Sequence, residues 1–222
     1  IAALRDALVT EDAAVIVLAS TGPAFSAGHD LREMTGRDPE FYDELFGACG
    51  ELMQTIHQLP QPVIASVQGI ATAAGCQLVA ACDLAVASDT SRFATPGVRV
   101  GLFCTTPMVE VARAVGRKRA MQMLLTGEPI DAATAADWGL VNEVVPAAHL
   151  AQRTHALALQ IATASPLVLA TGKRAFYDNL EPGFAAAYDH AGGIMAASAS
   201  TSDAQEGFAA FLEKRAPTWT GI

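Results

Sequence analysis

The stretch from Gln68 to Asp83 reads Gln-Gly-Ile-Ala-Thr-Ala-Ala-Gly-Cys-Gln-Leu-Val-Ala-Ala-Cys-Asp, and its pattern sets the architecture that we expect. The apolar run from Val63 to Val67 precedes it and predicts a buried strand. Apolar residues recur at helical spacing from Ala74 onward, so a helix is expected to begin there. The turn between strand and helix carries almost no side chains. It is either a tightly packed turn or a place where the free N–H groups at the helix start hold a developing oxyanion.

A second stretch has the same character. Residues 21–31 read Thr-Gly-Pro-Ala-Phe-Ser-Ala-Gly-His-Asp-Leu, and they follow the apolar run from Ala14 to Ala19, which predicts another strand. The chain therefore places small residues just after two predicted strands. Two such turns favour an oxyanion site over a turn that is merely compact, because that kind of site is built from more than one backbone donor.

At these segments the chain resembles the crotonase superfamily, which is also called the enoyl-CoA hydratase/isomerase family. Residues 25–31 match the family's first signature, and residues 69–78 match its second. Later landmarks follow in the same order, namely Phe93-Ala-Thr-Pro, Leu125-Thr-Gly-Glu-Pro-Ile, Trp138-Gly-Leu-Val-Asn-Glu-Val-Val-Pro, Ser165-Pro and Asp203-x-x-Glu-Gly. The resemblance covers nearly the whole chain and is nearest to the hydratase-domain-containing subgroup, which lacks both hydratase glutamates.

The resemblance implies an α/β fold, in which a crotonase-type spiral of ββα units carries a C-terminal helical region. We expect the spiral core to occupy residues 1–165 and the helical region, which mediates oligomerisation, to occupy residues 166–222. The family assembles as a homotrimer or a dimer of trimers, so the same assembly is expected. Residues 1–8 already look like the inside of an amphipathic helix, and the β-hairpin with which the family usually opens is therefore expected to be missing.

Composition limits the classes of function. The 222 residues are 51% hydrophobic, which is ample for one main core. A formal net charge of −9 argues against a nucleic-acid partner, since phosphate binding needs a basic surface. No apolar stretch approaches the ~18 residues of a membrane span, so no membrane association is expected. The four cysteines, Cys49, Cys76, Cys82 and Cys104, form no Cys-x-x-Cys pair, which favours free thiols and a cytoplasmic location.

The resemblance also implies an oxyanion hole made by the backbone N–H groups of His29 and Ala74. Losing one donor of such a pair typically costs roughly 10²–10³ in rate. Substrate contacts carried over from the family motifs fall on Ala27, Asp30, Leu31, Arg32, Gly75, Phe103, Thr105 and Lys214. Arg32 matches a family lysine near the coenzyme A phosphates, and Lys214 matches one supplied by a neighbouring subunit's C-terminal helix. As alternatives, both cations can be surface charges, and Asp30 can cap a helix.

The positions of the family's acid/base glutamates carry no carboxylate. Hydratases of the family have one glutamate where this chain has Gln77 and the other where it has Gly97. An amide can orient a water molecule but cannot act as its base, and glycine can do neither. A carboxylate position used by the family's dienoyl-CoA isomerases falls near Thr105. Ordinary hydratase activity is therefore expected to be weak or absent.

Other titratable groups leave alternatives open. His29 can act as a base near neutrality, or it can be a bystander whose backbone alone is used. Cys104 is a nucleophile only if its thiolate is favoured, and a buried structural thiol is the alternative. Glu110 and Asp137 are interpreted as solvated side chains of amphipathic helices.

We therefore interpret the chain as an acyl-CoA thioester-binding protein that resembles enoyl-CoA hydratases and isomerases. If it is an enzyme, the resemblance implies the lyase or isomerase class. The coenzyme A thioester is its substrate or ligand, and no other cofactor and no metal is expected. One alternative is an enzyme of other enolate chemistry, such as an isomerase, a thioesterase or a decarboxylase. The other is a non-catalytic binder of acyl-CoA.

Overall fold

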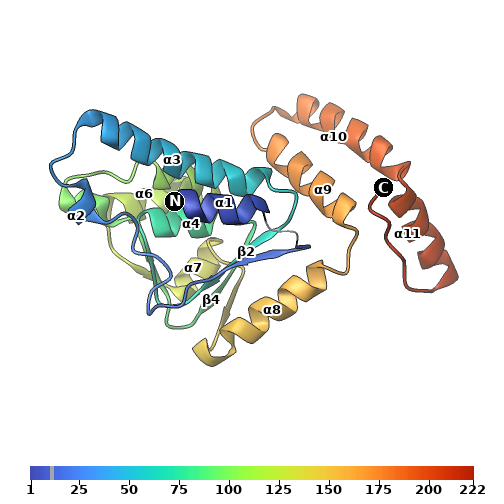
Figure 1. Ribbon diagram of the computed structural model, residues 1–222, viewed down its shortest axis with the longest axis horizontal. Coiled ribbons are helices and arrows are strands. Elements are labelled where there is room, and N and C mark those ends of the chain that lie inside the picture. The colour runs from blue at the N-terminus through green and yellow to red at the C-terminus, as the bar shows by residue number, and fades with distance from the viewer. Residues whose placement is uncertain (11–12) are drawn as a thin grey trace.

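A parallel sheet forms the centre of the protein, whose computed structural model describes residues 1–10 and 13–222 (Figure 1). The strands pair in the order β1-β2-β4-β7, and they are β1 (Ile16–Leu18), β2 (Val63–Val67), β4 (Leu84–Ser88) and β7 (Glu143–Val145). Every residue of β2 is buried, as expected for a parallel strand with cover on both faces. The predicted α/β class and the predicted strand over residues 63–67 are confirmed.

A second, smaller sheet lies beside the first one. It contains β3 (Ile70–Thr72), β5 (Arg92–Ala94) and β6 (Ile130–Asp131) in the order β3-β5-β6. The sequence predicts a bare turn where β3 lies. The strand forms because Gly69, with a φ of 63°, turns the chain, and because Ile70, Ala71 and Thr72 then pair in register with β5. Strands β2 and β3 and helix α4 (Ala74–Ala81) thus make one ββα unit.

Helices cover both faces of the central sheet. Ile64 of β2 faces α8 (Leu150–Ile161). Its neighbours Val63 and Ala65 face the opposite way, into the main core beside α3 (Pro39–Gln58). This alternation follows from the two-residue period of a strand, and it fixes which side of the sheet carries α3 and α4.

The other helices of the core connect these strands. They are α1 (Ala2–Thr10), α2 (Leu31–Met34), α5 (Pro107–Val115), α6 (Arg117–Thr126) and α7 (Ala132–Trp138), with the 3-10 helices η1 (Pro96–Val100) and η2 (Ala147–His149). The alternative interpretation of Asp30 as a helix cap is confirmed at α2, although the sequence gave no bounds for this helix. It begins because the Asp30 carboxylate accepts a hydrogen bond from Arg32 N at 2.9 Å, which satisfies a free donor of the first turn.

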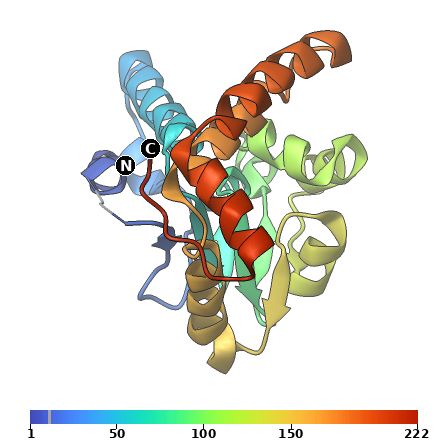
Figure 2. The same ribbon diagram turned by 90° about the vertical axis from the view of Figure 1, so that its right-hand side faces the viewer.

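Three helices make up the C-terminal part, and they are α9 (Pro166–Asp178), α10 (Phe184–Ala199) and α11 (Ser202–Glu213). Helix α9 packs against the C-terminal end of α3, whereas α10 and α11 project from the core (Figure 1, Figure 2). Lys173 fixes α9 to the core, because its Nζ donates to Asp83 at 2.6 Å and to the Ile56 carbonyl at 2.7 Å. The proposed division of the chain after residue 165 stays a prediction.

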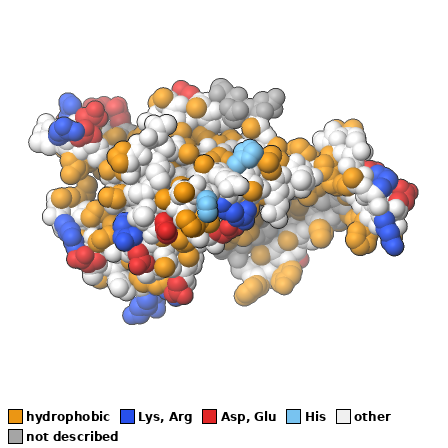
Figure 3. Space-filling model, turned by 90° about the horizontal axis from the view of Figure 1, so that it is seen from below, with side chains coloured by type: hydrophobic (Ala, Val, Ile, Leu, Met, Phe, Trp, Pro, Cys, Tyr) orange, Lys and Arg blue, Asp and Glu red, His pale blue; other side chains and the backbone are white. Residues whose placement is uncertain are grey.

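The C-terminal part exposes large hydrophobic side chains. They include Val168, Phe176, Leu180, Phe184, Tyr188, Met195, Phe208, Phe211, Leu212 and Ile222. Seen from below, hydrophobic side chains lie on the core and on the projecting part alike (Figure 3). Among the described residues, no single helix has the length and apolar composition to cross a membrane. Residues 147–161 and 166–178 have that length and composition only when the two helices are taken together, and the two are bent by 101° relative to each other.

Candidate functional site

The two segments that follow the first predicted strands, residues 21–31 and 68–83, lie side by side. Ser26 N donates to the Ile70 carbonyl at 3.1 Å, and Thr72 N donates to the Ser26 carbonyl at 2.9 Å. Ser26 thereby forms an isolated parallel bridge with Ala71 of β3. The contact needs glycine at position 75, since a Cβ on Gly75 would lie 2.3 Å from the Ser26 carbonyl oxygen. The absence of a side chain at Gly75 allows residues 21–31 to approach the start of α4, and the hydrogen bonds of Ser26 hold them there.

The backbone just before α4 is strained. Ala73 has a φ of 52° and a ψ of −119°, a conformation that residues with a Cβ rarely adopt. A hydrogen bond of 3.0 Å from Ala73 N to the Ala94 carbonyl helps to hold this geometry. Gly28 has a φ of 88°, and a Cβ on it would lie 3.2 Å from Ala74 N. Strain of this kind persists where the surroundings enforce it and clusters at functional sites, which favours the oxyanion interpretation.

A cavity of about 550 Å³ opens between these turns, α2, η1 and the start of α5. Its size falls in the range of ~300–1,000 Å³ that is typical of small-molecule sites. The predicted site residues that line it are Ala27, His29, Leu31, Ala74, Gly97, Phe103 and Thr105. Residues that the sequence did not single out complete the wall, among them Met34, Phe46, Ala73, Arg99, Val100 and Leu102. Within the described part of the chain, this wall contains no Asp or Glu.

The other predicted site residues lie outside the cavity wall, and they are Asp30, Arg32, Gly75, Gln77 and Lys214. Asp30 caps α2, and its Oδ1 lies 3.3 Å from Arg32 Nε. The Arg32 side chain is 93% exposed. Lys214 follows α11 in a left-handed conformation, in the projecting part of the molecule. Within one chain, neither cation is brought to the cavity.

Gln77 points into the core. The residue is 3% exposed, and its Oε1 accepts a hydrogen bond from Cys49 Sγ of α3 at 3.8 Å. Burial raises the pKa of the Cys49 thiol, so this donor keeps its proton at neutral pH. A carboxylate at position 77 would lose its hydration, and the Cys49 thiol is only a weak hydrogen-bond donor, so burying the charge would cost free energy.

Position 97 has no room for a side chain. A Cβ on Gly97 would lie 2.0 Å from the Leu102 carbonyl oxygen and 2.8 Å from Cys104 Sγ. Gly97 N donates a hydrogen bond to that sulfur at 3.3 Å. The chain turns back at Gly101, with a φ of 78°, and this turn returns residues 102–104 to η1. The loop path at position 97 therefore excludes any side chain, a carboxylate included.

Two titratable groups of the cavity are neutral near pH 7. Burial lowers the pKa of His29. Its Nε2 is buried without a hydrogen-bond partner among the described residues, and its ring lies edge-on to Phe46 with centroids 5.6 Å apart. Burial raises the pKa of the Cys104 thiol, although the hydrogen bond from Gly97 partly offsets this effect. The wall therefore offers a neutral imidazole and a thiol rather than a thiolate.

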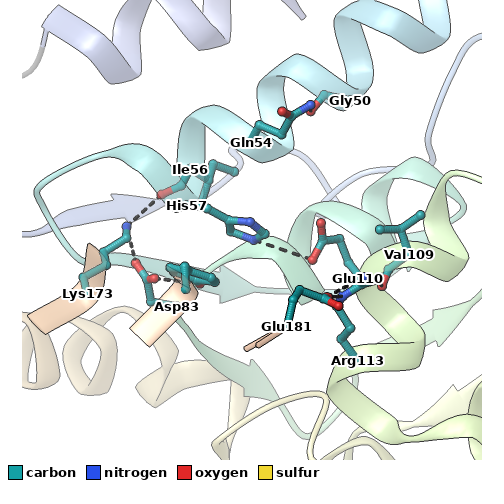
Figure 4. A network of polar contacts seen from close by, with 11 residues as sticks. Gly50, Gln54, Ile56, His57, Asp83, Val109, Glu110, Arg113, Lys173 and Glu181 are labelled. Carbon is teal, nitrogen blue, oxygen red and sulfur yellow. Dashed lines mark hydrogen bonds and ion pairs between the residues drawn. The ribbon is translucent and has the colours of Figure 1, made fainter. Parts of the chain in front are cut away.

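The prediction that Glu110 is solvated is wrong. Its side chain is only 12% exposed, and its Oε2 lies 3.5 Å from His57 Nε2, outside the cavity between the turns (Figure 4). The pattern of α5 gave no signal for this contact, because His57 lies on α3 and the contact is tertiary. Asp137, whose side chain is 75% exposed, is solvated as predicted.

Known proteins with similar sequences include two mammalian relatives. "Enoyl-CoA hydratase domain-containing protein 3, mitochondrial" of Rattus norvegicus is 49% identical over 212 residues, which cover 95% of this chain and 71% of the relative. The protein of the same name from Homo sapiens is 50% identical over 214 residues, covering 95% and 70%. A "Probable enoyl-CoA hydratase echA8" of Mycobacterium bovis is 34% identical over 218 residues, covering 94% and 81%.

The expected cytoplasmic location is contradicted by this comparison, because the rat and human relatives are both named as mitochondrial. The expectation rested on free cysteines, and Cys49, Cys76, Cys82 and Cys104 are indeed free and buried. Burial raises the pKa of Cys76 to about 12, which keeps that thiol protonated and unreactive. Such cysteines stay reduced because they are inaccessible, so they do not identify a compartment.

Solved structures agree with the sequence comparison. An enoyl-CoA hydratase of Mycobacterium smegmatis superposes with a TM-score of 0.95 at 48% identity, covering 98% of this chain and 87% of the other. Human enoyl Coenzyme A hydratase domain-containing protein 3 gives a TM-score of 0.94 at 47% identity, covering 98% and 89%. These matches confirm the crotonase-type fold. The sequence model described as enoyl-CoA hydratase/isomerase matches residues 1–222, and the chain therefore belongs to the enoyl-CoA hydratase/isomerase family.

Proposed function

We propose that the chain binds a coenzyme A thioester and holds the thioester oxygen between the backbone N–H groups of His29 and Ala74. The observation that carries this proposal is that both residues line one cavity, where Gly28 lies against Ala74 N. Membership of the enoyl-CoA hydratase/isomerase family supports the ligand class.

The start of α4 supplies the physical basis. No side chain caps the free N–H groups of its first turn, which therefore remain available to a ligand. The positive end of the helix dipole lies at the same place. Donors that are fixed before the ligand binds stabilise negative charge on an oxygen without having to reorganise. The strained Ala73 and the close contact of Gly75 with Ser26 provide that fixation.

We propose further that the protein does not hydrate enoyl-CoA by the usual pair of carboxylates. Gln77 is hydrogen-bonded to Cys49 in the core, and position 97 has no space for a side chain. The described wall of the cavity adds no other carboxylate. A bound thioester would therefore be polarised at its carbonyl without a carboxylate beside its reacting carbons.

A second candidate is an enzyme of other enolate chemistry. The unpartnered Nε2 of His29 favours it, because a neutral imidazole in the cavity wall can accept a proton from the α-carbon of a polarised thioester. The lowered pKa of His29 keeps the ring in this neutral form at physiological pH.

Replacing Ala74 by L-lactic acid tests the proposed donor, because the amide N–H becomes an ester oxygen and the side chain stays the same. Proline would be a poorer choice, since it disfavours the φ of 52° at Ala73. A hydrogen bond to a charged group contributes ~1.5–3 kcal/mol, so the affinity for acetoacetyl-CoA, an enolisable thioester, is expected to fall about tenfold to 150-fold. Titration calorimetry measures this change.

The matched control is the same exchange at Ala132, the first residue of α7, which does not line the cavity. This control is expected to keep the affinity of the unmodified protein. If the ester at position 74 also keeps it, the assignment of Ala74 as an oxyanion donor is refuted.

Purified protein is expected to hydrate crotonyl-CoA at least ~10²-fold more slowly than an ordinary hydratase assayed beside it. Water addition needs a positioned base and a positioned acid, and each contributes roughly 10²–10⁴ in rate. Loss of the enoyl absorbance measures the rate. Gln77→Glu is not expected to restore hydration, because the residue is 3% exposed and faces Cys49.

Rapid hydration by the unmodified protein would contradict this expectation. If His29→Gln then abolished it, His29 would be the base. A panel of acyl-CoA thioesters analysed by mass spectrometry extends the test to the second candidate. Chemical change that depends on His29 supports an enzyme of other enolate chemistry, and binding without change supports a non-catalytic binder.

We propose that the chain assembles as a homotrimer or a dimer of trimers through its C-terminal part. Phe184 and Phe211, which are 89% and 83% exposed, support this proposal, since large clustered apolar groups mark interaction surfaces. In that assembly Lys214 of a neighbouring chain would supply the cation that the thioester cavity does not receive from its own chain. Light scattering at micromolar concentration is expected to give the mass of three or six chains, and the mass of one chain would exclude the assembly.

A further inference from the structure

A second cavity, of about 520 Å³, lies at the other ends of α4 and α5. Helix α4 contributes Ala74 to the first cavity and Val79 to the second, and α5 contributes Pro107 to the first and Glu110 to the second. Helices α3 and α9, strand β4 and residues 139–142 also contribute to the second wall. This site is therefore separate from the proposed thioester site but is built on the same pair of helices.

Most charges at the second cavity are paired. Asp83 accepts hydrogen bonds from Lys173 Nζ at 2.6 Å, from Tyr177 Oη at 2.9 Å and from Val63 N at 2.7 Å. The Arg113 guanidinium donates to the Glu181 carboxylate at 2.9 Å. Figure 4 shows the Lys173–Asp83 contact on one side of the network and the Arg113–Glu181 contact on the other. Each pair has one positive and one negative member, so the pairs together add no net charge to the wall.

Glu110 is the exception. Its side chain is 12% exposed, and His57 Nε2 at 3.5 Å is the polar partner that the described residues offer to its carboxylate. The His57 side chain is itself 22% exposed and stacks on Tyr177, with ring centroids 4.2 Å apart. A neutral imidazole does not offset a negative charge. The wall is therefore left with one largely buried carboxylate that has no cation of its own, an arrangement that is costly when nothing fills the cavity.

The remaining wall of the cavity is mainly apolar. Val79, Leu140, Phe176, Leu180 and the ring of Tyr177 face it. A ligand that fits must therefore carry a positive charge at one end and an apolar body at the other. A metal ion fits less well, because no three His, Cys, Asp or Glu side chains are grouped to hold one among residues 1–10 and 13–222.

From this combination we infer that the second cavity is a binding site for a small organic amine. Its ammonium group faces the Glu110 carboxylate, and its apolar body packs against Phe176, Tyr177 and Leu180. The aromatic rings add a favourable cation–π contribution where the charge passes over their faces. The site is independent of thioester binding, so neither proposal stands or falls with the other.

The protonation states of Glu110 and His57 determine how the affinity for an amine changes with pH. Burial raises the pKa of Glu110, although Arg113 partly offsets the effect, and burial lowers the pKa of His57. The charged and titratable groups around the Glu110–His57 pair are Cys82, Asp83, Arg113, Lys173, Tyr177 and Glu181. A bound ammonium favours ionised Glu110, and an alkylamine stays protonated up to a pH of ~10. Amine affinity is therefore expected to rise as the pH increases through the raised pKa of Glu110.

Calorimetric titration with 2-phenylethylammonium chloride tests the inference, with 2-phenylethanol as the neutral analogue and 3-phenylpropanoate as the anionic analogue. The unmodified protein is expected to bind the ammonium compound at least tenfold more tightly than the alcohol at neutral pH. Glu110→Gln is expected to abolish this preference while keeping the weaker binding of the alcohol. The matched control is Glu51→Gln, which removes the same charge from an exposed site on α3 and should keep the preference.

Glu110→Gln removes a largely buried charge that no cation contacts directly, so its thermal unfolding temperature at neutral pH is expected to equal or exceed that of the unmodified protein. The comparison of the three probes, and its pH dependence, needs only the unmodified protein and so does not rely on any variant. A preference for the ammonium probe that grows with pH and disappears in Glu110→Gln supports the amine site. Absence of saturable binding, equal affinity for ammonium and alcohol, tighter binding of the anion, or a preference that survives in Glu110→Gln would overturn it.

Discussion

The contact between the Ser26 carbonyl and the bare Cα of Gly75 brings two distant segments of the chain into one wall. A side chain at Gly75 would separate them, because its Cβ would lie 2.3 Å from the Ser26 carbonyl oxygen, and one at Gly28 would crowd Ala74 N at 3.2 Å. The hydrogen bonds of Ser26 to β3 then fix the register of the first segment. The positive φ of Ala73 is tolerated inside this frame, and it directs the start of α4 toward the cavity.

This frame depends on backbone atoms, so it does not depend on the side chains at positions 77 and 97. At position 77 the Gln77 amide oxygen accepts a hydrogen bond from Cys49 in the core. At position 97 the Leu102 carbonyl and the Cys104 thiol fill the space that a side chain would need. The proposed function follows from this arrangement. In this proposal the main chain binds the thioester carbonyl, while proton transfer depends on neutral groups such as His29 or does not occur.

Local pattern was sufficient for much of the fold. The strand at residues 63–67 was predicted from an apolar run bounded by proline and glycine, and the helix from Ala74 was predicted from apolar residues at helical spacing; both are present. Strand β3 was missed because its three residues pair only with segments distant in sequence, including the bridge to Ser26. The His57–Glu110 contact was missed for the same reason, because α3 and α5 meet only in the folded chain. The exclusion of side chains at Gly97 also depends on tertiary contacts, although the missing carboxylate itself was evident from the sequence.

The central claim is that two backbone donors polarise a thioester carbonyl in a cavity whose described wall carries no carboxylate. Difference infrared spectroscopy of an acyl-CoA labelled with ¹³C at the thioester carbonyl measures that polarisation directly. Two hydrogen bonds from His29 N and Ala74 N withdraw electron density from the C=O bond, so the labelled band is predicted to move to lower frequency on binding than in water. A bound ligand whose carbonyl band stays at its frequency in water would contradict the account.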